Sequence, residues 1–166
     1  MHLDMSVGKD LTDSFKLYMM QDHPDAQDIT FSIRILGTNF WPLNPPTHNF
    51  VIPTEIAVTH VHFQEYYQTK HSGRKLTWLW NHSKNELLTN YLNQKYILVT
   101  SSYQMAVLLQ YNKCDTLSLN EIQAATAIST NTLLQVLSQL VKAKILISHK
   151  KEQYDLNPST FYQKMR

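Results

Sequence analysis

The sequence predicts an α+β fold, in which a small antiparallel sheet with a covering helix is followed by a winged-helix domain. Two features of the apolar pattern lead to this prediction. Between residues 29 and 100, short segments alternate apolar with polar residues, which is the period of strands. From residue 101 onward the spacing becomes helical, and two short strands then flank a lysine-rich turn. Helices followed by a two-stranded wing are the order of a winged helix.

The first element is a short helix predicted within residues 1–22. Leu11, Phe15 and Tyr18 are four and three residues apart, so they share one face of this helix. Asp10 is suited to cap its first turn. On its own the helix has little to pack against, and we therefore expect it to be loosely held.

Residues 23–100 are predicted to form an α/β domain with four strands. The alternation is clearest where Leu76, Trp78 and Trp80 point to one side and the intervening residues point to the other. Short connections predict that the last three strands form an antiparallel meander, with the first strand beside it and at least one sheet edge open. The predicted strands are 29–41, 75–81, 86–92 and 95–100.

A helix predicted over residues 53–70 is placed on the aromatic face of this sheet. Its apolar stripe includes Phe63, Tyr67 and His60. A second histidine, His62, suggests a metal site at first sight. Because residues two apart do not face each other on a helix, a buried or surface histidine is the better interpretation.

Residues 101–158 are predicted to be the winged-helix domain. Ser102 is suited to cap a helix that runs to Asn112, and Ser118 with Glu121 forms a capping box for a second helix.

A third helix of this domain begins at Ser129 or Thr130, and the wing strands are 145–148 and 153–156, followed by a tail at 159–166. The predicted buried stripe of the third helix is Leu133, Leu134, Leu137, Leu140 and Val141.

Composition excludes several classes of protein. The formal net charge of the 166 residues is +2, so no global field favours nucleic acid or an anionic membrane. A single cysteine excludes a disulfide framework within the chain and suits a reducing compartment. No apolar run reaches the roughly 18 residues of a membrane span, and the first ten residues are not a signal peptide. We expect an intracellular soluble protein.

No catalytic, cofactor-binding or metal-binding constellation is found in the sequence. The glycines are too far apart for a phosphate-binding loop. Cys114 has no adjacent histidine, so an ordinary loop cysteine is a better interpretation than a nucleophile. We predict neither a cofactor nor an enzyme active site.

The winged helix raises the alternative of a nucleic-acid-binding module. A recognition helix needs side chains that grip phosphates and base edges. The third helix offers one cation, Lys142, on its exposed face, with Lys144, Lys150 and Lys151 nearby. A structural or protein-contacting role is therefore favoured over DNA binding, which stays as the alternative.

Five segments resemble the cullin family, the scaffold subunits of multi-subunit ubiquitin ligases. The resemblance covers nearly the whole chain in order and is nearest to the cullin-1 and cullin-2 branches. Asn39 stands where the family usually has glycine. The segments are DMSVGKDLTDSFK at 4–16, ILGTNFWPL at 35–43, IPTEI at 52–56, HSGRKLTWLW at 71–80 and YQMAVLLQYN at 103–112.

The resemblance implies a fragment of the C-terminal cullin homology region, acting as a non-catalytic scaffold. Its first helix would end a truncated helical bundle, and its sheet would take in the N-terminal strand of a RING-box protein. That partner recruits the ubiquitin-conjugating enzyme, which therefore binds only indirectly, and substrate adaptors would bind only the missing N-terminal stalk. The family's modified lysine segment has no counterpart here, and cytoplasm and nucleus are the expected locations. The predicted strand-binding residues are Phe31, Ile33, Ile35, Lys75, Leu76, Thr77, Trp78 and Trp80.

Overall fold

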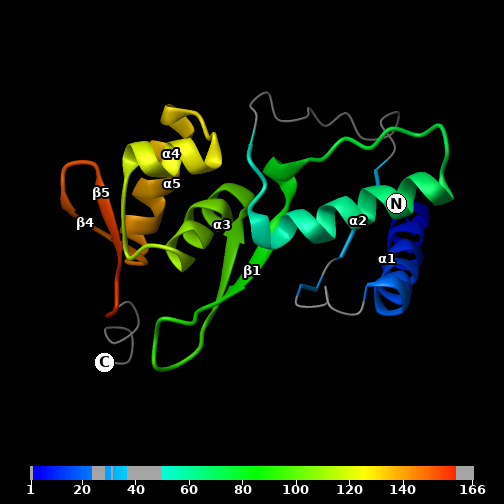
Figure 1. The fold of residues 1–166 in the computed structure, drawn as a ribbon, viewed down its shortest axis with the longest axis horizontal. Helices are drawn as coiled ribbons and strands as arrows, with labels where there is room; N and C mark the ends of the chain where they lie inside the picture. Colours follow the sequence, from blue (N-terminus) through cyan, green and yellow to red (C-terminus); the bar gives the residue numbers. More distant parts are fainter. Residues whose placement is uncertain (1, 24–28, 31, 37–49, 160–166) are drawn as a thin grey trace. The chain divides into compact units, whose positions relative to one another are not determined.

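The computed structural model describes residues 2–23, 29–30, 32–36 and 50–159, and it gives side chains from Lys9 onward (Figure 1). The chain divides into two compact units. The first comprises Met1–Pro45 with Thr54–Trp78, and the second comprises Pro46–Pro53 with Leu79–Arg166.

The first unit is built around helices α1 (His2–Asp22) and α2 (Thr54–Lys70). Phe15 and Phe63 are almost fully buried and meet edge to face with ring centroids 5.2 Å apart. The predicted α1 stripe is confirmed at Leu11 and Phe15, which are buried. The expectation that α1 has little to pack against is wrong, because the helix buries these side chains against α2.

Turn residues end α2 and release the chain into an irregular segment. The His71 N–H still donates to the Tyr67 carbonyl at 2.9 Å, and Gly73 then takes a positive φ of 84°. That conformation is one that glycine adopts without steric cost. The predicted break between helix and following segment is confirmed at Ser72 and Gly73.

The two strands predicted on either side of α2 are absent from the described residues. Residues 32–36 and 74–79 contain no strand. The alternation is present as burial, since Ile33 is buried while Ser32 and Arg34 are exposed. Alternation decides which side chains face the core, but a strand also requires a neighbour that accepts its ladder hydrogen bonds. The remainder of the predicted strand 29–41, including Phe31, lies outside the described residues.

The second unit opens with a short 3-10 helix, η2 (Trp80–His82), and an antiparallel hairpin. Its strands are β1 (Lys84–Leu88) and β2 (Ile97–Ser101), with Lys84 opposite Ser101 and Leu88 opposite Ile97. The predicted meander is therefore wrong, because in the part of the chain that the structure describes this sheet has two strands.

The hairpin loop is longer than its predicted turn. The Thr89 N–H donates to the Tyr96 carbonyl at 2.9 Å, and the Tyr96 N–H donates to the Thr89 hydroxyl at 2.9 Å. These two bonds close the loop at its base. Residues 89–92, predicted as strand, belong to it.

The predicted winged helix is confirmed in the rest of the second unit. Its helices are α3 (Ser102–Leu109), η3 (Gln110–Asn112), α4 (Leu119–Thr126) and α5 (Thr130–Lys142). Its strands are β3 (Thr116–Ser118), β4 (Leu146–Lys150) and β5 (Gln153–Leu156), which pair antiparallel in the order β3-β5-β4. Strand β3, which no sequence pattern predicted, extends the wing. Figure 1 shows α4 beside α5, with the β4–β5 wing next to them.

Side-chain caps explain where two of these helices begin. Ser118 and Glu121 form the predicted capping box of α4. Helix α3 is capped by Ser101 with Gln104. The predicted cap, Ser102, is fully buried.

The winged-helix core gathers apolar residues from α3, α4, α5 and the wing. Ile122, Leu133, Leu137 and Leu146 are each at most 1% exposed. Leu134 was predicted to be buried but is 43% exposed, because it follows Leu133 and lies at the edge of the stripe.

Candidate functional site

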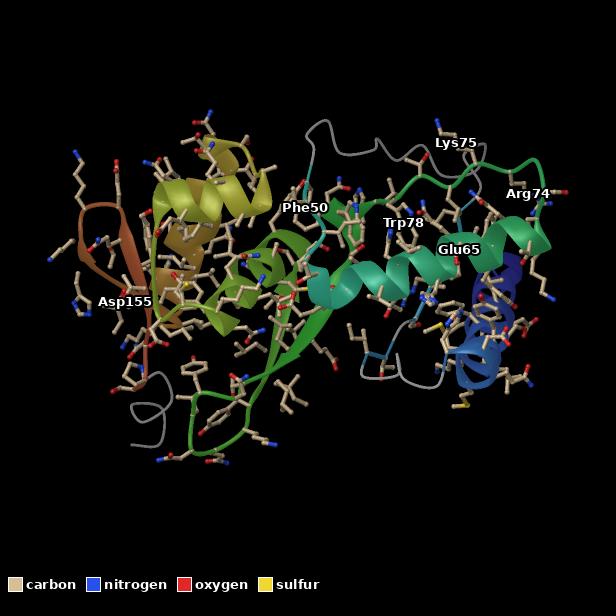
Figure 2. The ribbon with its side chains drawn as sticks, viewed as in Figure 1. Phe50, Glu65, Arg74, Lys75, Trp78 and Asp155 are labelled. Atoms are coloured by element: carbon tan, nitrogen blue, oxygen red, sulfur yellow. The ribbon has the colours of Figure 1, made fainter. Side chains whose placement is uncertain are left out.

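The predicted strand-binding residues are divided between the two units. Ile33, Ile35, Leu76 and Trp78 belong to the core of the first unit or pack against it. Lys75 and Thr77 are exposed on the same segment, and Figure 2 shows the Lys75 side chain pointing away from α2. Phe31 lies outside the described residues, and Trp80 belongs to the second unit.

Ile33 is fixed by helix α1. Its N–H donates to the Thr12 hydroxyl at 3.1 Å, and the same hydroxyl lies 3.5 Å from the Ile33 carbonyl. Thr12 and Ile33 are both buried, so these contacts form inside the unit. At this position the backbone N–H is used by a side chain of the chain itself.

Trp78 packs on the buried face of α2. Its ring centroid lies 5.7 Å from that of Phe63 and 4.3 Å from that of His60. Burial lowers the pKa of His60 below its usual value, which favours the neutral imidazole beside this indole. The predicted packing of the second helix on the aromatic face is thus confirmed for Trp78.

Trp80 lies in an aromatic cluster of the second unit. Its ring centroid is 5.6 Å from that of Phe50, which in turn meets Tyr103 of α3 at 5.4 Å. Trp78 and Trp80 were predicted to share one face, yet they pack in different clusters because η2 begins at Trp80. Phe50 was missed by the sequence analysis, since it follows a proline-rich stretch without periodicity.

The β1–β2 hairpin presents an apolar surface that the sequence analysis did not single out. Leu88, Ile97 and Val99 are 59%, 64% and 68% exposed. The opposite face packs against α3, where the Asn85 amide donates to the Ser102 hydroxyl at 3.2 Å. Because this sheet has two strands within the described chain, the outer edge of each strand is open. The period-two pattern of β2 was visible, but both of its faces carry apolar residues, so periodicity could not tell which is exposed.

The exposed face of α5 is mostly neutral. Its exposed polar side chains are Thr130, Asn131, Gln135, Ser138, Gln139 and Lys142. Gln139 is engaged within the unit, because its Oε1 accepts a hydrogen bond from Gln104 at 2.9 Å. A single cation on this helix can neutralise few phosphates, so it would add little affinity for nucleic acid.

Over the part of the chain that the structure describes, no group of three metal-ligating side chains comes together, and no helix is long and apolar enough to cross a membrane. Cys114 is an exposed free thiol in the loop before β3.

The sequence model of a family described as the cullin alpha+beta domain matches residues 35–164 of this chain. The chain belongs to the cullin family.

Named relatives agree with this assignment. The Cullin-1 of Dictyostelium discoideum is 43% identical over 151 residues, which cover 89% of this chain and 20% of that protein. The Cullin-1 of Schizosaccharomyces pombe is 38% identical over 150 residues, covering 89% and 19%. Human Cullin-4A is 34% identical over 153 residues, covering 91% and 20%. The chain thus spans about a fifth of the length of these curated relatives.

Proposed function

We propose that this chain is the part of a ubiquitin-ligase scaffold that docks a RING-box protein. The RING-box protein would position the ubiquitin-conjugating enzyme, so the chemistry of ubiquitin transfer would occur on the partners. Substrate adaptors would bind other parts of a full-length cullin, in the cytoplasm and nucleus. Membership of the cullin family supports the scaffold role.

The docking proposal rests on residues 75–78, which have the alternating pattern of a strand but are not paired as one in the structure. Residues 75–78 alternate exposed and half-buried side chains, but the structure contains no strand there. Exposed Lys75 and Thr77 lie on the outer side, while Leu76 and Trp78 are anchored in the first unit. An incoming extended peptide would supply the missing ladder partner. Backbone hydrogen bonds would then give affinity and neighbouring side-chain pockets selectivity.

Thr77 offers the sharpest test of strand docking. Its side chain is exposed, so replacing it leaves the core contacts of Leu76 and Trp78 in place. Thr77→Pro removes one ladder donor, whereas the matched control Thr77→Ala keeps the N–H. We expect the proline variant to bind a RING-box protein about fivefold to tenfold more weakly, in line with about 1 kcal/mol for one hydrogen bond. Isothermal titration calorimetry would measure the affinity.

Folding must be checked by a thermal melt of each variant. Ile33→Pro is the weaker probe, because the Ile33 N–H already donates to Thr12 and its loss would disturb the fold. A folded Thr77→Pro chain that binds with the affinity of Thr77→Ala would show that the partner strand docks elsewhere.

A further inference from the structure

The C-terminal end of α1 is held on α2 by a cluster of ring contacts. Tyr18 packs against Tyr66 at a centroid distance of 5.1 Å, and Phe15 packs against Tyr66 at 5.5 Å. The last contact of this series joins His23, the residue after α1, to His62 on α2. Figure 1 shows α1 running across the direction of α2, and residues of the two helices are in contact.

The two histidines touch each other directly. Their ring centroids are 3.8 Å apart and their planes are almost perpendicular, at 87°. The Tyr18 hydroxyl and His23 Nε2 are within hydrogen-bond distance at 3.3 Å, which fixes the His23 ring. The Nδ1 of His62 is buried and has no hydrogen-bond partner among the described residues. The rings are too close for a metal ion between them, so direct contact is their role.

We propose that His23 and His62 form a proton-sensitive latch that holds the end of α1 on α2 while the His62 ring is neutral. An imidazolium at His62 would lie against a second imidazole with its buried Nδ1–H unpaired. A charge without a hydrogen-bond partner is costly to bury. Proton uptake would therefore favour release of the end of α1, where water can hydrate the charge.

The charged groups around the two histidines have opposing effects on the pKa of His62. Burial is the main cause that lowers the pKa of His62, the charge of His23 lowers it further, and Glu65 on α2 partly offsets both. Tyr18 and Asp22 belong to the α1 side, and the Lys70 amino group lies over the Tyr66 ring at 5.9 Å. Arg34 is the exposed cation of the segment that packs on α1.

The direction of the pH effect follows from the lowered pKa of His62. The unfolded or released state binds more protons than the latched state as the pH falls through about 6.5, the ordinary value of histidine. The latch is therefore intact above that pH and weakens below it, until the pH falls past the lowered pKa of the latched state. His60 also has a lowered pKa, but its contact is with Trp78, so it reports on a different place.

The test uses hydrogen exchange and NMR of the full 166-residue chain. The His23 N–H donates to the Met19 carbonyl at 3.0 Å, so its protection factor reports whether the end of α1 is docked. We expect that protection to fall by up to about tenfold per pH unit between about pH 6.5 and about pH 5.5, the slope of one proton. His62→Phe keeps a ring at the contact but cannot titrate, so its protection should stay constant.

His149→Phe is the matched control, because His149 is an exposed histidine on β4 of the other unit and its loss should leave the fall unchanged. Asp25 and Asp28 follow His23 in the sequence, and the same titration in an Asp25→Asn, Asp28→Asn chain removes their charge from the result. An equal fall in His62→Phe and the unmodified chain would overturn the proposal. So would imidazole ¹⁵N shifts showing that His62 protonates in the unmodified chain without loss of protection. The NMR signal of the Trp78 indole reports on titration of His60, so the effect of His60 can be distinguished from that of His62.

Discussion

At the scale of single residues, a hydrogen bond from one side chain joins two elements of the winged helix. The Tyr111 hydroxyl donates to the Tyr154 carbonyl at 2.8 Å and so ties η3 to the wing strand β5. Burial raises the pKa of Tyr111 above its usual value, and the nearby Asp155 raises it further. The neutral phenol is thus the form that the folded protein favours.

Tyr111→Phe should destabilise the winged helix by about 1 kcal/mol, because the phenol donor to the Tyr154 carbonyl is lost. Tyr96→Phe is the control, since its hydroxyl donates at 3.1 Å to Gln94 in an exposed loop and should cost less. Urea unfolding gives both values. The raised pKa means that the Tyr111 contribution is present below the ordinary tyrosine value of about 10 and is lost at higher pH. Equal stability of the two variants would contradict this assignment.

At the scale of elements, the capping box of α4 was predictable and the sheet was not. The box formed by Ser118 and Glu121 is local, because all of its atoms lie within four consecutive residues. The pairing of residues 75–79 depends on a distant neighbour, and no pattern within that segment contains this information. For the same reason Phe50 and the exposed face of β1–β2 escaped notice. The helical stripe of α5 was found, except that exposed Leu134 was included and buried Val136 was left out.

Ser118→Ala should destabilise α4 by about 1 kcal/mol through loss of the side-chain acceptor for the Glu121 N–H. Ser118→Asp retains an oxygen at the cap and should keep most of the stability. Hydrogen bonds from Ser118 lower the pKa of Glu121. The resulting stabilisation is present above the ordinary glutamate value of about 4.3 and is lost as the pH falls below it. Thermal melts across this range would test the sign, and an Ala variant as stable as the Asp variant would refute the capping role.

At the scale of the whole molecule, the candidate docking residues belong to two compact units, with Trp78 at the end of one and Leu79 at the start of the other. The family assignment came from five motifs spread along the chain, so it was predictable from sequence. Where each motif packs was not, since HSGRKLTWLW crosses from one unit into the other.

The net charge of +2 and the single cation on α5 predict that the chain binds duplex DNA no more tightly than a non-specific ligand. Dissociation constants at moderate salt should be roughly 10⁻⁴–10⁻⁶ M. A gel shift with unrelated duplexes would measure this, and nanomolar, sequence-selective binding would support the nucleic-acid alternative.

The exposed side of the β1–β2 hairpin has a practical consequence for anyone preparing the protein. Leu88, Ile97 and Val99 form an exposed apolar surface, and among the described residues no further strand pairs with either outer edge of the hairpin. Unpaired strand edges can pair with the same edge of another copy of the chain, which leads to aggregation. Yield and shelf life should therefore depend on protein concentration, and co-expression with a partner that covers this hairpin should improve both.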